Sequence, residues 1–142
     1  NSQYENFLNS MRDRYFGRIF VSYDFSPELA RKIYAASDLY LMPSKSEPCG
    51  LSQMIALRYG TIPVVHETGG LCDSISDSED GVGNGFRFRR YDAWDMYDCI
   101  KRAIAGYQNF PGWTKLMERA MRCNYSWQKS AKQYIKLYQS CI

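Results

Sequence analysis

A short segment over residues 46–53 combines residue types that could bind a ligand and take part in chemistry. It reads SEPCGLSQ, follows a predicted strand and is expected to open a helix. The start of a helix leaves backbone N–H groups without internal partners and carries a partial positive charge, so a diphosphate binds well there. Gly50 has no side chain, and a ligand can therefore approach its backbone closely.

Two side chains of this segment could take part in chemistry. The Ser52 hydroxyl can donate a hydrogen bond to a ligand oxygen. The Glu47 carboxylate is expected at the mouth of the site, where it can accept hydrogen bonds from sugar hydroxyls and favour developing positive charge. A structural alternative stays open, in which Glu47 caps the helix and Gly50 only permits tight packing.

Two further segments follow predicted strands. Thr68-Gly69-Gly70-Leu71 could let the backbone approach a sugar or phosphate, although two glycines alone favour an ordinary turn. Phe25 could stack on a nucleobase. Because it precedes the expected Ser26 cap, the local pattern favours a hydrophobic staple near Ala30 instead.

The elements that must position these residues alternate between strand and helix. Strands are expected over 18–23, 39–43, 62–65 and 86–88. Helices are expected from Ser2 to before Gly17, after the Ser26 cap, and over about 48–59, 91–107, 113–123 and 126–141. The pattern predicts one α/β domain, with a Rossmann-like parallel sheet, flanking helices and a helical C-terminal tail. Ligands of such sheets bind beyond the carboxyl ends of the strands, here over 23–27, 43–52 and 66–71.

Composition excludes several classes of protein. The five cysteines are odd in number and form no C-x-x-C, which argues against a disulfide scaffold or a zinc site and favours a reducing, cytoplasmic location. The only histidine, His66, is expected at the end of a strand, and we predict no metal and no cofactor. The net charge is +3 without a basic stripe, so no nucleic-acid partner is expected. No apolar run is long enough to predict a membrane span.

Two glycine- and arginine-rich patterns are set aside. Gly81, Gly83 and Gly85 have the spacing G-x-G-x-G and precede a strand, which differs from a dinucleotide fingerprint. Arg87, Arg89 and Arg90 could contact a polyanion, but their position on a short strand is more typical of a solvated face.

Together these segments resemble the bacterial glycogen synthases and plant starch synthases. The resemblance rests on E-P-C-G-L at 47–51, R-Y-G-T-I-P at 58–63 and T-G-G-L at 68–71, and it extends in order and spacing over nearly the whole chain. It implies the two-domain GT-B fold, with residues 1–142 as an N-terminally truncated, nucleotide-sugar-binding C-terminal domain. The first residue, Asn1, likewise indicates a piece of a longer polypeptide.

The resemblance also implies an activity and a set of site residues. The activity is transfer of glucose from ADP-glucose to the non-reducing end of an α-1,4-glucan, with retention. Glu47 would lie beside the donor glucose. The backbone of Cys49, Gly50 and Leu51, together with Ser52, would lie near the glucose and the phosphates. An aromatic residue near Phe25 would stack against the base. Thr68, Gly69 and Gly70 would complete the substrate-binding set.

Three departures from the family pattern bear on these expectations. Ile55 stands where related retaining glycosyltransferases often carry a second Glu, and His66-Glu67 replaces two basic residues of many relatives. The basic phosphate-binding loop and the facing N-terminal domain are absent, so the 142 residues alone are expected to be inactive and to self-associate. The alternative is a stand-alone, non-catalytic module for sugar-nucleotide binding or assembly, and UDP-glucose is an alternative donor.

Overall fold

The computed structural model describes residues 2–141, and the chain divides into two units, Asn1–Ala30 and Arg31–Ile142. The strands are β1 (Leu39–Met42), β2 (Ile62–His66) and β3 (Phe86–Phe88). The helices are α1 (Ser2–Arg14), α2 (Pro27–Ala36), α3 (Ser52–Tyr59), α4 (Gly70–Ser74), α5 (Ala93–Gln108), α6 (Phe110–Arg122) and α7 (Trp127–Ser140), with a short 3₁₀ turn η1 (Ser78–Asp80).

The three strands form one parallel sheet in the order β1-β2-β3, which confirms the predicted fold class. Leu41 is paired with Val64, and Val64 with Phe86. Every residue of β2 is buried, as its continuous apolar sequence predicts for a central parallel strand. Because all three strands are parallel, their carboxyl ends lie at the same edge of the sheet.

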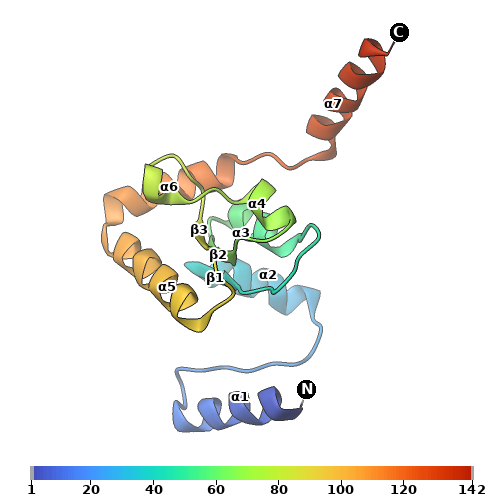
Figure 1. Ribbon diagram of the computed structural model, residues 1–142. Helices are drawn as coiled ribbons and strands as arrows, with labels where there is room; N and C mark the ends of the chain where they lie inside the picture. The colour runs from blue at the N-terminus through green and yellow to red at the C-terminus, as the bar shows by residue number, and fades with distance from the viewer. Residues whose placement is uncertain (1, 142) are drawn as a thin grey trace. The chain divides into compact units, whose positions relative to one another are not determined.

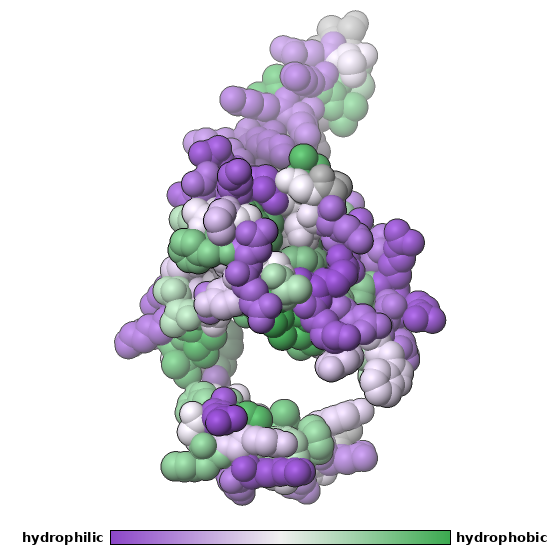
Figure 2. Space-filling model, turned by 90° about the vertical axis from the view of Figure 1, so that its left-hand side faces the viewer, coloured by the Kyte–Doolittle hydropathy of each residue, from purple (hydrophilic) through white to green (hydrophobic). Residues whose placement is uncertain are grey.

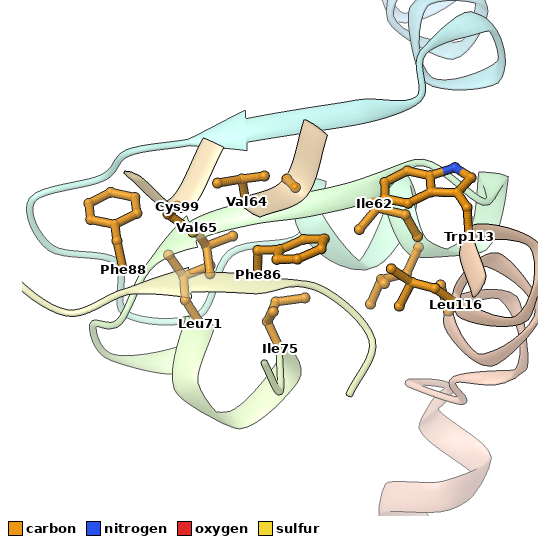
Figure 3. Close-up of a cluster of buried hydrophobic side chains, with 13 residues drawn as sticks. Ile62, Val64, Val65, Leu71, Ile75, Phe86, Phe88, Cys99, Trp113 and Leu116 are labelled. Atoms are coloured by element: carbon orange, nitrogen blue, oxygen red, sulfur yellow. The ribbon is translucent and has the colours of Figure 1, made fainter. Parts of the chain in front are cut away.

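Helices cover this sheet and complete its core. Helix α3 packs against β1 and β2, α5 packs against β2 and β3, and α6 contacts both helices. Figure 1 shows α3 and α5 on opposite sides of the sheet. The core joins β2 and β3 to Leu71, Cys99, Trp113 and Leu116 of the helices and to Ile75, which follows α4; Figure 3 labels these residues.

The exposed surface of the second unit is mixed, with charged residues beside large apolar side chains such as Trp94, Tyr97 and Phe110. Figure 2 views the molecule from the side on which α5 lies and shows hydrophilic residues over much of that unit. Helix α5 is amphipathic: Cys99 and Ala103 are buried, whereas Asp98 and Lys101 are exposed and form an ion pair. None of the helices described between residues 2 and 141 combines the length and the apolar character that crossing a bilayer requires.

The predicted strand over 18–23 is wrong. These residues have no strand structure, and Phe20 and Tyr23 are largely exposed. Tyr23 donates a hydrogen bond to the Glu5 carbonyl of α1 within the same unit. The β-branched and aromatic composition is compatible with a strand, but a strand also requires a neighbouring strand, and none of the described residues supplies one.

Other element boundaries follow local signals. Ser26 caps α2 through a 3.2 Å hydrogen bond from the Leu29 N–H to its hydroxyl, and Pro27 occupies the first turn, as predicted. Gly60 ends α3 and Asp92 caps α5. The predicted start of the third helix at Pro48 is wrong, because α3 begins at Ser52.

The free edge of β1 predicts self-association of the 142-residue chain. Within residues 2–141, β1 pairs only with β2, and its other edge offers unpaired N–H and C=O groups. Leu41 on this strand is 43% exposed. We expect light scattering to give a mass above that of the monomer, and the variant Leu41→Lys to lower it. A monomer at all concentrations, or an equal response to Leu137→Lys on α7, would contradict this expectation.

Candidate functional site

The two loops predicted to bind a ligand meet at the carboxyl edge of the sheet. The loop after β1 contains Glu47, and the loop after β2 leads into Gly70 at the start of α4. The Gly70 N–H donates a 3.0 Å hydrogen bond to the Glu47 carbonyl. Glu47 and Gly70 are 23 residues apart in the sequence, yet their two loops form one surface.

Gly69 and Gly70 let the two loops approach each other. A Cβ on Gly70 would lie 2.6 Å from the Cys49 Cα and 2.8 Å from the Pro48 carbonyl oxygen. A Cβ on Gly69 would overlap the Glu47 carbonyl oxygen. The paired glycines are thus required by packing of protein backbone against protein backbone, which the sequence-based interpretation had assigned to a ligand or to a turn.

The segment between Pro48 and Leu51 is a loop because of the conformation of Gly50. Gly50 has φ +74°, a left-handed value that interrupts a right-handed helix. Within residues 2–141, the backbone N–H groups of Cys49, Gly50 and Leu51 donate no hydrogen bond to the protein. This tight turn followed by a helix start leaves donors available for an anion or for sugar oxygens.

The side chains of this site differ in accessibility. Glu47 is half-buried, and its Oε2 accepts a 3.4 Å hydrogen bond from the Ser44 hydroxyl. Ser52 directs its hydroxyl to the Met42 sulfur at 3.4 Å, so this group is engaged with β1. Cys49 and Leu51 are exposed, and Thr68 is half-buried in the turn before α4.

From the sequence, His66 was expected at the end of a strand, but no contact between it and the neighbouring loops was predicted. His66 is 7% exposed, and its Nδ1 lies 2.9 Å from the Ser44 carbonyl oxygen. A carbonyl can only accept, so Nδ1 carries the proton. The ring also stacks on Phe88 and contacts Tyr91, each at 5.3 Å between centroids. His66 therefore ties together the loops that follow all three strands. The sequence signals at this position were a polar residue at the end of an apolar strand and the departure from the family pattern at His66-Glu67.

Charges beside the site are compensated within the protein. Glu67 lies between Arg87, at 3.7 Å, and Arg89, at 3.6 Å. The acidic residue that departs from the family pattern therefore has two basic partners on and after β3. The Asp95 carboxylate accepts hydrogen bonds from the backbone N–H groups of Arg90 and Arg89. These bonds, that of Arg90 above all, hold the pKa of the Asp95 carboxyl below its ordinary value.

Phe25, which was predicted to stack on a nucleobase, directly precedes the Ser26 cap of α2. It belongs to the first unit and is 96% exposed, so it forms no hydrophobic staple with Ala30. Glu47, Cys49, Gly50, Leu51, Ser52, Thr68, Gly69 and Gly70 all lie in the second unit, on the loops after β1 and β2 or at the helix starts that follow them.

A hollow of about 310 Å³ also lies at this edge of the sheet, lined by Pro43, Phe88, Tyr91, Asp92, Ala93 and Met96. The part of the chain that the structure describes contains no group of three His, Cys, Asp or Glu residues able to hold a metal ion. All five cysteines are free.

Comparison with known proteins gives one family. Residues 18–120 match the model of the family "Glycosyl transferases group 1". The chain is 51% identical over 144 aligned residues to the glycogen synthase of Bacillus cereus (strain Q1), covering 100% of this chain and 30% of that protein. It is 46% identical to the glycogen synthase of Geotalea uraniireducens (strain Rf4), with the same coverage. The chain thus spans about 30% of the length of these relatives.

Two solved structures are similar to the fold. The catalytic domain of starch synthase IV from Arabidopsis thaliana, bound to ADP and acarbose, matches with a TM-score of 0.86 and 35% identity over 99% of this chain and 30% of that one. Sucrose-phosphate synthase from Thermosynechococcus elongatus matches with a TM-score of 0.66 and 23% identity, over 98% of this chain and 34% of that one, which supports the fold alone.

Proposed function

Because this chain belongs to the glycosyl transferases group 1 family, we propose that it forms the donor half of a glycogen or starch synthase. In this proposal the complete polypeptide transfers glucose from ADP-glucose to the non-reducing end of an α-1,4-glucan, with retention. The observation that carries it is the hydrogen bond between Gly70 and Glu47, which joins the E-P-C-G-L and T-G-G-L loops into one surface. The relatives named glycogen synthase support the reaction, and the ADP in the starch synthase IV structure supports the adenine nucleotide.

The chemistry requires two opposite charges to be stabilised. Breaking the bond between glucose and diphosphate builds oxocarbenium character on the sugar and negative charge on the leaving diphosphate. The free N–H groups of Cys49, Gly50 and Leu51 are suited to the diphosphate or to sugar hydroxyls. The Glu47 carboxylate is suited to the positive charge on the sugar, and Ser52, Thr68, Gly69 and Gly70 shape the surrounding surface.

A second domain completes the site in this proposal. Residues 1–142 are the C-terminal, nucleotide-sugar-binding part, and an N-terminal domain of the same polypeptide faces them, binds the glucan and excludes water. We also assign Phe25 to stacking on the adenine base and place the enzyme in the cytoplasm. Donor choice tests the proposal: the complete polypeptide should extend a glucan from ADP-glucose faster than from UDP-glucose, and failure to use either donor would refute it.

The 142 residues alone should bind ADP weakly and transfer no glucose. The turn at Gly50 and the Gly70 loop leave some affinity for phosphate, but positioning by a facing domain, which can supply roughly 7–11 kcal/mol of a barrier, is missing. Calorimetry should give a Kd for ADP on the order of millimolar, about −4 kcal/mol. A radiolabelled glucan-extension assay should read background, and transfer by this chain alone would overturn the two-domain proposal.

A further inference from the structure

Gln53, in the first turn of α3, contacts the loop after β1 and the end of α4 from the protein interior. The residue is fully buried, with 0% exposure. Its amide nitrogen, Nε2, lies 3.1 Å from the Cys49 carbonyl oxygen and 3.0 Å from the Gly50 carbonyl oxygen. The same nitrogen lies 3.1 Å from the hydroxyl of Ser74 at the end of α4. One side-chain amide therefore joins the loop after β1 to the helix that follows the second loop.

The contacts continue into a closed hydrogen-bonded ring. The Ser74 hydroxyl donates to the Gly70 carbonyl at 3.0 Å. The Gly70 N–H in turn donates to the Glu47 carbonyl at 3.0 Å, which returns the path to the first loop. Displacement of Gln53 would consequently disturb the backbone of the first loop from Glu47 to Gly50.

The orientation of the Gln53 amide follows from its surroundings. Rotation by 180° would place the amide oxygen against two carbonyl oxygens, which cannot donate. In the observed orientation Oε1 is buried and has no hydrogen-bond partner within residues 2–141. An unsatisfied buried acceptor is unfavourable, so the contacts of the amide nitrogen are what hold the side chain in this position.

Peptide geometry connects these contacts to the free donors of the site. In a trans peptide unit the C=O and the N–H point in opposite directions, and the described chain contains no cis peptide bond. Since the carbonyls of Cys49 and Gly50 point inward to Gln53, the N–H groups of Gly50 and Leu51 point away from it. These are two of the donors that the protein itself leaves unused.

We propose that Gln53 is a positioning residue for the donor site. It fixes the carbonyls of Cys49 and Gly50, and thereby aims the N–H groups of Gly50 and Leu51 at the donor and holds the backbone next to Glu47. The inference rests on the proposed function. It adds a buried residue that touches no substrate and acts through the loop it holds.

The test compares two buried hydrogen-bond donors in the complete polypeptide. Gln53→Met keeps the size of the side chain and removes its donor. The matched control is Thr61→Val, because Thr61 is 1% exposed and donates to the carbonyls of Tyr34, at 2.5 Å, and Ser37, at 2.8 Å, at the opposite end of β2. A misplacement of about 1 Å can cost about 100-fold in rate, so we expect kcat/KM with ADP-glucose to fall by at least about tenfold more in Gln53→Met than in Thr61→Val.

A pH profile separates positioning from general stability. Gln53→Glu restores a donor only while the carboxyl is protonated, and burial raises the pKa of a carboxyl group. Activity of Gln53→Glu relative to wild type should therefore rise as the pH falls, whereas Thr61→Val should show the wild-type profile. If Gln53→Met fails to fold, Ser74→Ala removes another bond of the same ring and should lower kcat/KM more than Thr61→Val does.

The rate of thiol labelling tests the positioning role of Gln53 independently of catalysis. Cys49 is exposed and lies in the loop that Gln53 holds, so its alkylation by iodoacetamide should be faster in Gln53→Met than in Thr61→Val. An inactive wild type with this change in labelling would refute the proposed function and leave the positioning of the loop supported. An active wild type in which Gln53→Met stays within about twofold of Thr61→Val in both kcat/KM and labelling rate would overturn the inference.

Discussion

Glu47→Gln in the complete polypeptide should lower kcat by about 10² to 10³, the range found when one group that stabilises transition-state charge is removed. The Kd for ADP should change little, because ADP lacks the glucose at which Glu47 is proposed to act. Interactions that strengthen only in the transition state appear in kcat and leave ground-state binding intact. Steady-state kinetics with ADP-glucose and calorimetry with ADP measure the two quantities separately.

Glu118→Gln is the matched control for this substitution. Glu118 lies on α6, where it is 58% exposed and pairs with Arg122 at 3.8 Å, so its neutralisation should leave kcat unchanged. Ser44→Ala, which removes the hydrogen bond to the Glu47 carboxylate, should have an intermediate effect. Near wild-type kcat with poor ADP affinity in Glu47→Gln would contradict the role assigned to this residue.

Gly70→Ala should destabilise the protein and damage the site together. The new Cβ would lie 2.6 Å from the Cys49 Cα, and backbone atoms cannot move aside as a flexible side chain can. Overpacking of this kind costs typically about 1–3 kcal/mol, and here the displaced atoms belong to the proposed donor loop. We therefore expect a lower Tm in thermal unfolding and a kcat/KM reduced by about tenfold or more.

Gly106→Ala provides a control in which the change in stability should have the opposite sign. Gly106 lies within α5, and a Cβ there would meet the Phe86 ring at 3.4 Å, an ordinary contact. Replacing Gly by Ala inside a helix is favourable by up to about 1 kcal/mol, so this variant should be at least as stable as the wild type. If both glycine variants had equal stability and equal activity, the close approach of the two loops would be shown to be unnecessary for either property.

The parts of the fold that local chemistry decides were predictable from the sequence. The continuous apolar run of β2, the Ser26 cap with Pro27, and the glycine that ends α3 each carry their own structural signal, and the structure confirms them. The strand expected over 18–23 failed because strand formation depends on a pairing partner, which composition cannot reveal.

The site was only partly predictable for a related reason. The E-P-C-G-L and T-G-G-L segments indicated where to look, since both follow strands of a parallel sheet. Gly50 adopts a left-handed conformation that delays α3 to Ser52, and helical periodicity does not encode this turn or the hydrogen bond from Gln53 to the Gly50 carbonyl. The contact of Gly70 with Cys49 and the bridging role of His66 likewise join segments distant in the sequence.

The central claim is that the loops after β1 and β2 together bind the sugar nucleotide, and hydrogen exchange tests it most directly. The N–H groups of Cys49, Gly50 and Leu51 are not used within the described protein, so they should exchange fast in the complete polypeptide without ligand. Saturating ADP-glucose, added without a glucan acceptor, should slow exchange in peptides covering 47–52 and 67–71 and leave α6 unchanged. Protection elsewhere, with both loops exchanging at their ligand-free rates, would contradict the account.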